Sequence, residues 1–175
     1  PGTETDVDTV TIKLVAVDAD VAEGESATYK VQLSDDADKA VTTIKPMTVS
    51  FTYSYTTAEG EDITETGSVV VPAGQSEVAV SVATIDDVYA EGVENFTIKI
   101  DSVTEQSQFE TVSVDTTAID TSITDNKIPG TETDVDTVTI KLVAVDADVA
   151  EGESATYKVQ LSDDADKAVT TIKPM

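Results

Sequence analysis

The chain has 175 residues, 35 of them acidic and 10 basic, for a formal net charge of −25 at pH 7. Every basic residue is Lys, and His, Cys and Trp are absent, which excludes an imidazole base, a thiolate nucleophile, disulfides and zinc sites of the usual kinds. Such a polyanion repels nucleic acid, and because no run of 18 apolar residues occurs, we expect no insertion of this segment into a membrane.

Alternation of apolar and polar residues predicts β-strands along most of the chain. Gly, Asp and Pro signals separate the alternating segments, as in AEGES, SDDADK and PAGQ, and no helical periodicity persists. Short strands at this spacing predict an all-β fold, an immunoglobulin-like Greek-key β-sandwich of about seven strands. The predicted strands are 9–17, 27–34, 48–56, 67–72, 76–84, 95–103 and 110–124.

A perfect internal repeat defines the domain organisation. Residues 1–47 recur without a change as residues 129–175, so the period is about 128 residues. A strand pattern ends and Pro-Gly follows in DNKIPGTETD (125–134), which marks the boundary. The predicted organisation is a complete module at 1–126, a linker at 127–134, and the first two strands of the next, identical repeat at 129–175.

The second copy of the repeated sequence has no complete module to join. Two strands cannot bury a core of their own, so both copies are competent to complete the segment 48–128, and only one can do so. We predict that 1–47 completes it, because Met47 runs directly into Thr48. Residues 129–175 should then be disordered, or should pair with another molecule by strand exchange.

The acidic residues gather at turns and strand ends. In ATIDDVYAEGVENFTI (83–98), four carboxylates occur within nine positions, and no basic residue lies among them. Further groups of acids occur at 18–25, 35–38, 59–62 and 125. Because alternate turns of a sandwich emerge at the same end, several groups should converge, and oxygen-rich loops of this kind are what Ca²⁺ requires.

Other interpretations of the acids are a solvated surface and a catalytic pair. A charged run is usually solvated, which we favour for Asp35, Asp36 and Asp38, whereas Asp18 and Asp20 are equally compatible with solvation and with metal binding. Paired carboxylates also hydrolyse glycosidic bonds, but the chain has no Trp, His or Arg to hold a sugar. We therefore do not expect an enzyme.

Several motifs resemble the Calx-beta module. They are VAEGESATYKVQLS (21–34), YTTAEGEDI (55–63), GSVVVPAGQSEVAVSVATIDDVYAEGVENFTIKI (67–100) and TSITDN (121–126). Identical tandem copies, rich in Thr and Asp and without Cys, are also similar to the immunoglobulin-like extender repeats of large bacterial RTX adhesins. The resemblance implies that Ca²⁺ is bound by Glu23, Asp62, Asp86, Asp87, Glu91, Glu94, Asp125 and Asn126, with Asp146, Asp148 or Glu151 of the next repeat as substitutes at the linker.

These observations favour a structural function. The resemblance implies an extracellular spacer on a bacterial cell surface, with neighbouring identical repeats as its partners and with Ca²⁺ stiffening the acidic turns and the linker. A calcium-dependent module that binds carbohydrate or protein is the main alternative. A regulatory calcium sensor beside a transporter is a further one, for which the sequence offers no support.

Overall fold

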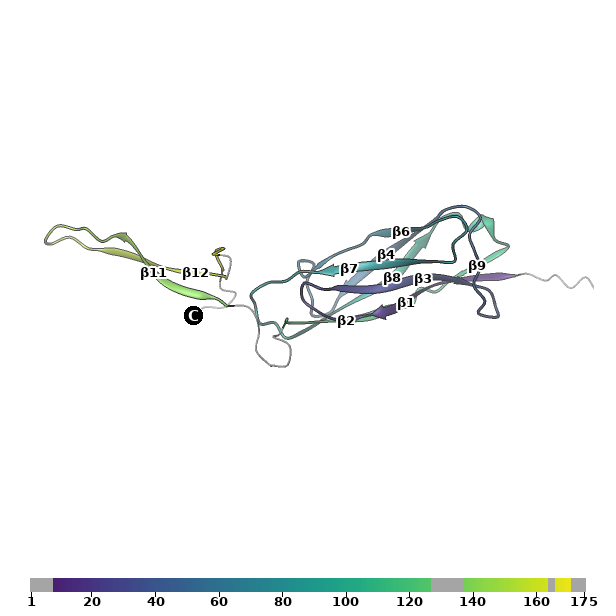
Figure 1. Cartoon of the computed structure of the whole chain (residues 1–175), viewed down its shortest axis with the longest axis horizontal. Helices are drawn as coiled ribbons and strands as arrows, with labels where there is room; N and C mark the ends of the chain where they lie inside the picture. The colour runs from purple at the N-terminus through teal and green to yellow at the C-terminus, as the bar shows by residue number, and fades with distance from the viewer. Residues whose placement is uncertain (1–7, 127–136, 164–165, 171–175) are drawn as a thin grey trace, which may run out of the picture. The chain divides into compact units, whose positions relative to one another are not determined.

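The computed structural model describes residues 8–126, 137–163 and 166–170 (Figure 1). The chain divides into two compact units, one containing residues up to 86 together with 91–125, the other containing 87–90 and the residues from 126 onward. Both consist of β-structure, with a short 3-10 turn, η1 (Gln106–Gln108), in the first. No helix in the described residues is long and apolar enough to cross a membrane.

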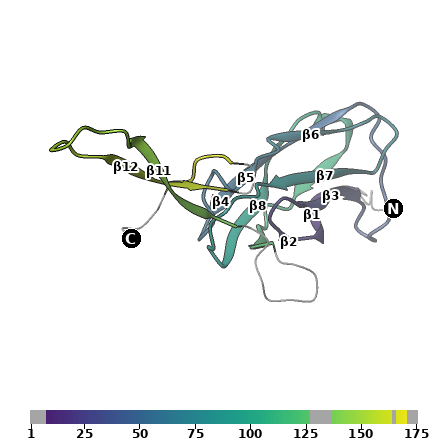
Figure 2. The same cartoon turned by 60° about the vertical axis from the view of Figure 1, so that its left-hand side comes forward.

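The first unit is a sandwich of two five-stranded sheets (Figures 1 and 2), which confirms the predicted all-β fold. The order of the first sheet is β5-β7-β3-β1-β9, and β1 and β9 pair in parallel. Its strands are β1 (Thr9–Asp18), β3 (Ser26–Ser34), β5 (Ile63–Thr64), β7 (Glu77–Thr84) and β9 (Thr111–Val114). The order of the second sheet is β2-β10-β8-β4-β6, and β2 and β10 pair in parallel. Its strands are β2 (Asp20–Ala22), β4 (Met47–Tyr55), β6 (Ser68–Val71), β8 (Val93–Val103) and β10 (Ile119–Thr124).

The sandwich has more strands than alternation predicted. The strands β2 and β5 are only three and two residues long, too short to show a periodic pattern. The prediction of one strand at 110–124 is wrong, because β9 joins the first sheet and β10 joins the second. Between them the amide of Asp115 donates to the carbonyl oxygen of Ile12 (2.9 Å) and the amide of Thr117 donates to Oδ1 of Asp115 (2.9 Å). The hydrogen bonds from Thr117 lower the pKa of Asp115 and stabilise this break.

The core lies between the two sheets and consists of the inward-facing residues of each strand. Successive side chains of a strand point to opposite faces, so the apolar positions of the alternating pattern meet there. Ile12, Val31 and Ile98 are completely buried. Tyr29 on β3 and Thr121 on β10 join the sheets through a hydrogen bond of 2.5 Å between their hydroxyl oxygens. The inward-facing positions of the predicted strands thus supply most of the core.

The second unit contains a hairpin of the repeated sequence, formed by β11 (Thr139–Asp146) and β12 (Thr156–Ser162). Its register pairs Ile140 with Leu161, as the register of the first unit pairs Ile12 with Leu33. The first copy supplies β1, β2 and β3 of the sandwich. The second copy forms a two-stranded hairpin within its described residues, which differs from the expectation of disorder, and its pairing with another molecule stays a prediction.

The stability of the sandwich should fall at alkaline pH because of Tyr53 on β4. Its hydroxyl donates to the carbonyl oxygen of Thr66 (2.9 Å) and accepts from the Thr66 amide (3.1 Å). Burial raises the pKa of Tyr53 from 10.0 to about 12, so the stabilising contribution of the protonated phenol is complete below pH 10 and is lost as the pH rises through 12. In urea titrations followed by circular dichroism, Tyr53→Phe should lose less unfolding free energy than the wild type between these pH values. Equal losses would contradict this.

A candidate metal centre at one end of the sandwich

The acidic turns meet at the end of the sandwich where β10 finishes. The amide of Glu23 donates to the carbonyl oxygen of Thr124 (2.9 Å), which ties the turn after β2 to the last residue of β10. The amide of Thr84 donates to the carbonyl oxygen of Glu25 (2.8 Å), which ties the same turn to the end of β7. The loop 85–92 starts there and leads into β8. Turns far apart in the sequence therefore converge, as the strand pattern predicted.

Gly24 gives the turn between β2 and β3 its shape. Its φ of +75° lies in the left-handed region, which residues other than glycine rarely adopt. A Cβ atom at this position would lie 3.3 Å from Cβ of Asp86, so the turn also packs closely against the loop after β7. Glycine thus allows Glu23 and the loop of Asp86 to approach one another.

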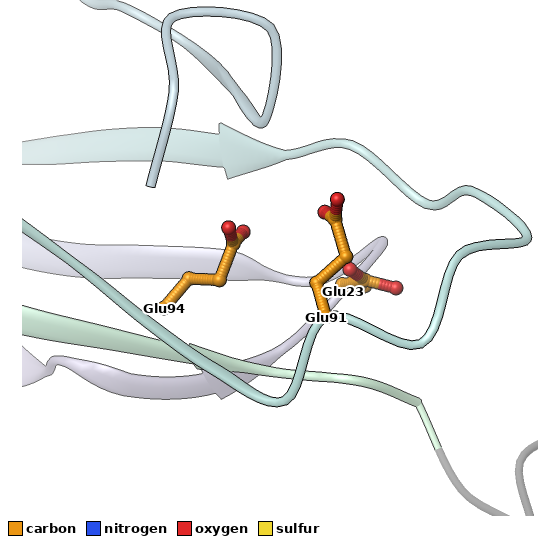
Figure 3. Close-up of side chains that lie close together, drawn as sticks. All are labelled: Glu23, Glu91 and Glu94. Carbon is orange, nitrogen blue, oxygen red and sulfur yellow. The ribbon is translucent and has the colours of Figure 1, made fainter. Parts of the chain in front are cut away.

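Three glutamates gather at this end from three different segments. Glu23 comes from the turn after β2, Glu91 from the loop before β8, and Glu94 from β8 itself (Figure 3). One carboxylate oxygen of each lies within 4.8 Å of the corresponding oxygens of the other two. Glu23 and Glu94 are buried, with 8% of their surface exposed, and Glu91 is exposed. Two of the three carboxylates are thus withdrawn from water beside a third.

The arrangement fits a calcium ion. Calcium takes oxygen ligands at about 2.3–2.6 Å, so two ligands of one ion are at most about 5 Å apart. The separations among the three carboxylates meet this limit. Burial of carboxylates is costly unless a positive charge or hydrogen bonds compensate it. A hard divalent cation between Glu23, Glu91 and Glu94 would provide that compensation, with access from the side of Glu91.

Asp125 positions the loop that carries Glu91. Its Oδ1 accepts hydrogen bonds from the amides of Glu91 (3.3 Å) and Gly92 (3.1 Å), and its Oδ2 accepts from Gly92 as well (3.3 Å). The carboxylate therefore fixes the backbone at the start of β8 from just beyond β10. Asp125 was predicted as a ligand. In the structure it binds the backbone of the loop that carries Glu91, and it does not belong to the group of three glutamates.

Two other predicted ligands, Asp86 and Asp62, belong to segments at this end of the sandwich. Asp86 packs against Gly24, the residue that follows Glu23. Asp62 is tied to this end because its carbonyl oxygen accepts the amide of Ile85 (2.8 Å), while its Oδ2 accepts the amide of Glu59. Neither aspartate belongs to the group of three whose oxygens meet.

Of the two aspartates around Ala19, Asp20 lies beside β10 and Asp18 ends β1. Asp20 accepts a hydrogen bond of 2.6 Å from the hydroxyl of Ser122. Asp18, the last residue of β1, pairs with Thr28 in the sheet. These contacts occupy Asp20 in holding β2 against β10, and metal binding by either residue stays a prediction.

The remaining predicted ligands belong to the second unit. Asp87 accepts the amide of Tyr89 through Oδ1 (2.7 Å), which shapes the loop locally. Asn126 is half-buried, and three acids of the second repeat are exposed. Their metal binding stays a prediction; these three acids are Asp146, Asp148 and Glu151.

Sequence reasoning missed the residue that holds the turn of Glu23 in place. The hydroxyl of Thr84 donates to the carbonyl oxygens of Glu25 (2.9 Å) and Ala22 (3.1 Å), and only 6% of the residue is exposed. Its signal is a hydroxyl at the inward position that follows Val80 and Val82 in the alternating pattern. A buried polar residue usually has a hydrogen-bond partner, and here the partners are carbonyl oxygens of the turn that carries Glu23.

Comparison with known protein families identifies the family of this chain. Residues 8–126 match the model of the LapA domain. The chain belongs to the LapA domain family. The LapA domain thus ends at the acidic end of the sandwich, directly after β10. No curated protein matches the chain.

Two solved structures show the same fold as this LapA domain. The apo-form Calx CBD1 domain is 18% identical, with a TM-score of 0.50, and the match covers 67% of this chain and 98% of that one. The calcium binding domain CBD12 of CALX1.1 is 15% identical, with a TM-score of 0.50, and the match covers 90% and 71% of the two chains. The Calx-beta resemblance of the motifs is confirmed at the level of the fold.

Substitution of Gly24 tests the packing of the turn that carries Glu23. Gly24→Ala should destabilise the LapA domain by about 1–3 kcal/mol, because it adds a strained positive φ and a contact of 3.3 Å with Asp86. Gly74→Ala is the matched control, since Gly74 has a similar φ of +81° but no atom within 4 Å of its added Cβ. Urea denaturation should show the larger loss for Gly24→Ala. Equal losses would mean that the approach of Asp86 is unimportant.

Proposed function

We propose that this LapA domain is a spacer module of a large adhesin on a bacterial cell surface and that Ca²⁺ stiffens it. The family is one of large adhesins, and the fold is a β-sandwich similar to that of the Calx CBD1 domain. The sequence adds a verbatim repeat, which is typical of a structural array rather than of a module with its own ligand. We therefore place the protein outside the cell.

The path of the chain through the sandwich suits a spacer. The amide of Asp8 contacts Glu110 at one end (3.3 Å), and β1 then runs to the opposite end. There Glu23 contacts Thr124, the last residue of β10 (2.9 Å). The chain thus enters at one end of the sandwich and leaves at the other. Because a ten-residue strand spans about 33 Å, each module in an array would add roughly that length.

The single observation that carries the calcium proposal is the meeting of Glu23, Glu91 and Glu94. The three glutamates lie at the end of the sandwich where β10 finishes. Asp125, the residue after β10, bonds the loop that carries Glu91. Bound Ca²⁺ would supply the positive charge that offsets the three carboxylates. The protein contributes the turn of Gly24, the loop held by Asp125 and the hydroxyl of Thr84, which keep the ligands in place. The Calx relative whose structure is described as a calcium binding domain supports this reading.

Calcium should raise the melting temperature of the domain through these residues. Extracellular calcium modules have Kd values of about 10⁻⁴–10⁻³ M, so about 10 mM Ca²⁺ should add about 1–3 kcal/mol. For a domain of this size that is a rise of roughly 5–15 °C over the value in EDTA. Glu94→Gln should lose more than half of this rise. The measurement is the difference between the two conditions for each variant, by differential scanning calorimetry.

Glu61→Gln is the control for Glu94→Gln. Glu61 is an exposed acid of the turn before β5, outside the group of three glutamates. It should keep the full calcium response, which would exclude a general effect of lowering the net charge. A wild-type melting temperature that is the same in calcium and in EDTA would refute the calcium proposal.

The stiffening of an array is a separate expectation. A protein of two complete 128-residue periods should have a larger maximum dimension in calcium than in EDTA by small-angle X-ray scattering, because bound Ca²⁺ would fix the loop and chain end at the exit of the first module. The same array with Glu94→Gln in both repeats should keep the EDTA value under both conditions. Equal dimensions for the wild-type array would refute stiffening while leaving the melting experiment unaffected.

A further inference from the structure

The loop between β7 and β8 contacts the following repeat. Its residues 87–90 belong to one compact unit with the residues from 126 onward. Within that unit the hydroxyl of Tyr89 donates a hydrogen bond to the carbonyl oxygen of Thr170 (2.7 Å). Thr170 is the counterpart of Thr42, because the repeated sequence recurs after 128 residues. The bond therefore joins a loop of one repeat to the position of Thr42 in the next repeat.

Tyr89 has the character of a contact residue. It lies in a loop and is half-buried, and its amide donates to Oδ1 of Asp87 (2.7 Å), which fixes the backbone that carries the ring. Tyrosine is enriched at protein interfaces because its ring buries apolar surface while its hydroxyl bonds a polar partner. The other four tyrosines of the chain lie in strands; they are Tyr29, Tyr53, Tyr55 and Tyr157.

The loop that carries Tyr89 is anchored to its own sandwich on both sides. On the side of β7, Asp86 packs against Gly24. On the side of β8, the amides of Glu91 and Gly92 donate to the carboxylate of Asp125 (3.3 and 3.1 Å). Residues 87–90 between these anchors are therefore presented from a fixed base, so a contact made by Tyr89 constrains the module as a whole.

The loop that carries Thr170 has the same local structure as its counterpart in the complete module. The amides of Val41 and Val169 each donate to a leucine carbonyl oxygen of the preceding strand, at 3.0 and 3.1 Å. Each loop also contains one aspartate with a left-handed φ, of 57° and 59°, at corresponding positions. Thr42 is exposed in the complete module, as Thr170 is in the second repeat. A complete module thus offers the same acceptor to a tyrosine outside it.

Tyr89 and Thr42 lie at opposite ends of one sandwich. The loop of Thr42 starts after Ser34, which pairs with Thr11 near the start of β1. The loop of Tyr89 starts after Thr84, whose amide bonds the turn between β2 and β3 at the far end of β1. Because a ten-residue strand spans about 33 Å, these two residues cannot meet within one module. The hydroxyl of Tyr89 reaches this acceptor only in a neighbouring module.

We propose that Tyr89 of each module donates a hydrogen bond to the carbonyl oxygen of Thr42 in the next module, and that this contact sets the angle between consecutive modules. The partner surface is the loop 35–46 of an identical module, at the end where β1 starts. The inference rests on the proposed function as an array of spacer modules, but it does not require the calcium site. It assigns the orientation of neighbouring modules to a contact between their folded ends.

The test measures the orientation of two modules in an array of two complete 128-residue periods. The chain has no Cys, so Thr52→Cys in both modules provides one spin-label site in each. Thr52 is exposed on β4, away from both loops of the contact. Double electron–electron resonance then gives the distribution of distances between the two labels. We expect a narrow distribution for the labelled array without further changes. Tyr89→Ala in the first module should widen it at least twofold, and Tyr89→Phe, which removes only the hydroxyl, should widen it less.

The same substitutions in the second module are the matched control. The tyrosine of the second module has no following module in this array, so the distribution should keep its original width. Composition and net charge are the same for both placements. The melting temperature should also change equally for the two placements, which separates the contact between modules from an effect on the loop itself.

Three results would overturn the proposal. Equal widening by both placements would mean that Tyr89 acts within its own module. An unchanged width for Tyr89→Phe in the first module would show that the hydrogen bond does not set the angle. A broad distribution that Tyr89→Ala in the first module leaves unchanged would show that the contact does not form.

The calcium proposal fails or holds separately. Tyr89 lies outside the group of three glutamates, so the melting experiment with Glu94→Gln does not depend on it. A domain whose melting temperature ignores calcium would refute the calcium site and leave the comparison of the two Tyr89 placements valid.

Discussion

The structure depends on the covering of the apolar face of β1 and β3 by the opposite sheet. This contact buries Ile12 and Val31, and it positions Tyr29 to bond Thr121 across the core. It also brings the turn after β2 to the end of β10, so that Glu23 reaches Glu91 and Glu94. The packing of the core and the assembly of the candidate metal centre are therefore coupled, because the same 47 residues supply two of the five strands of one sheet and one of the three glutamates.

The meeting of three carboxylates at the acidic end of the sandwich is electrostatically unfavourable unless positive charge or hydrogen bonds compensate it. Two carboxylates about 4 Å apart repel by on the order of 4 kcal/mol at an effective dielectric constant near 20, and here three meet with two of them buried. Three residues nevertheless hold the segments of the glutamates close together. Gly24 shapes the turn after Glu23, the hydroxyl of Thr84 bonds that turn, and the carboxylate of Asp125 bonds the loop of Glu91. A divalent cation bound between the three carboxylates would replace their mutual repulsion by attraction to the cation, which would account for this arrangement.

Much of the sandwich could be predicted from period-two alternation, because that pattern reports one buried and one exposed face. The short strands β2 and β5 could not, since two or three residues show no period. The segment 110–124 looked like one strand, yet the bonds around Asp115 divide it between the sheets. Of the acids, the pattern indicated which turns would converge, but the choice of Glu23, Glu91 and Glu94 over Asp62 and Asp125 depends on side-chain directions that only packing sets.

The two copies of the repeated 47 residues show which features the local sequence determines and which depend on tertiary structure. Both copies form the same hairpin with the same register and the same bulge, so local sequence alone determined strand pairing. Burial was decided by tertiary structure, because Ile12 is fully buried while Ile140, in an identical local sequence, is 60% exposed. The physical reason is that hydrogen bonds between neighbouring strands form within the copy, whereas coverage of its apolar face requires residues 47–125, which accommodate one copy at a time.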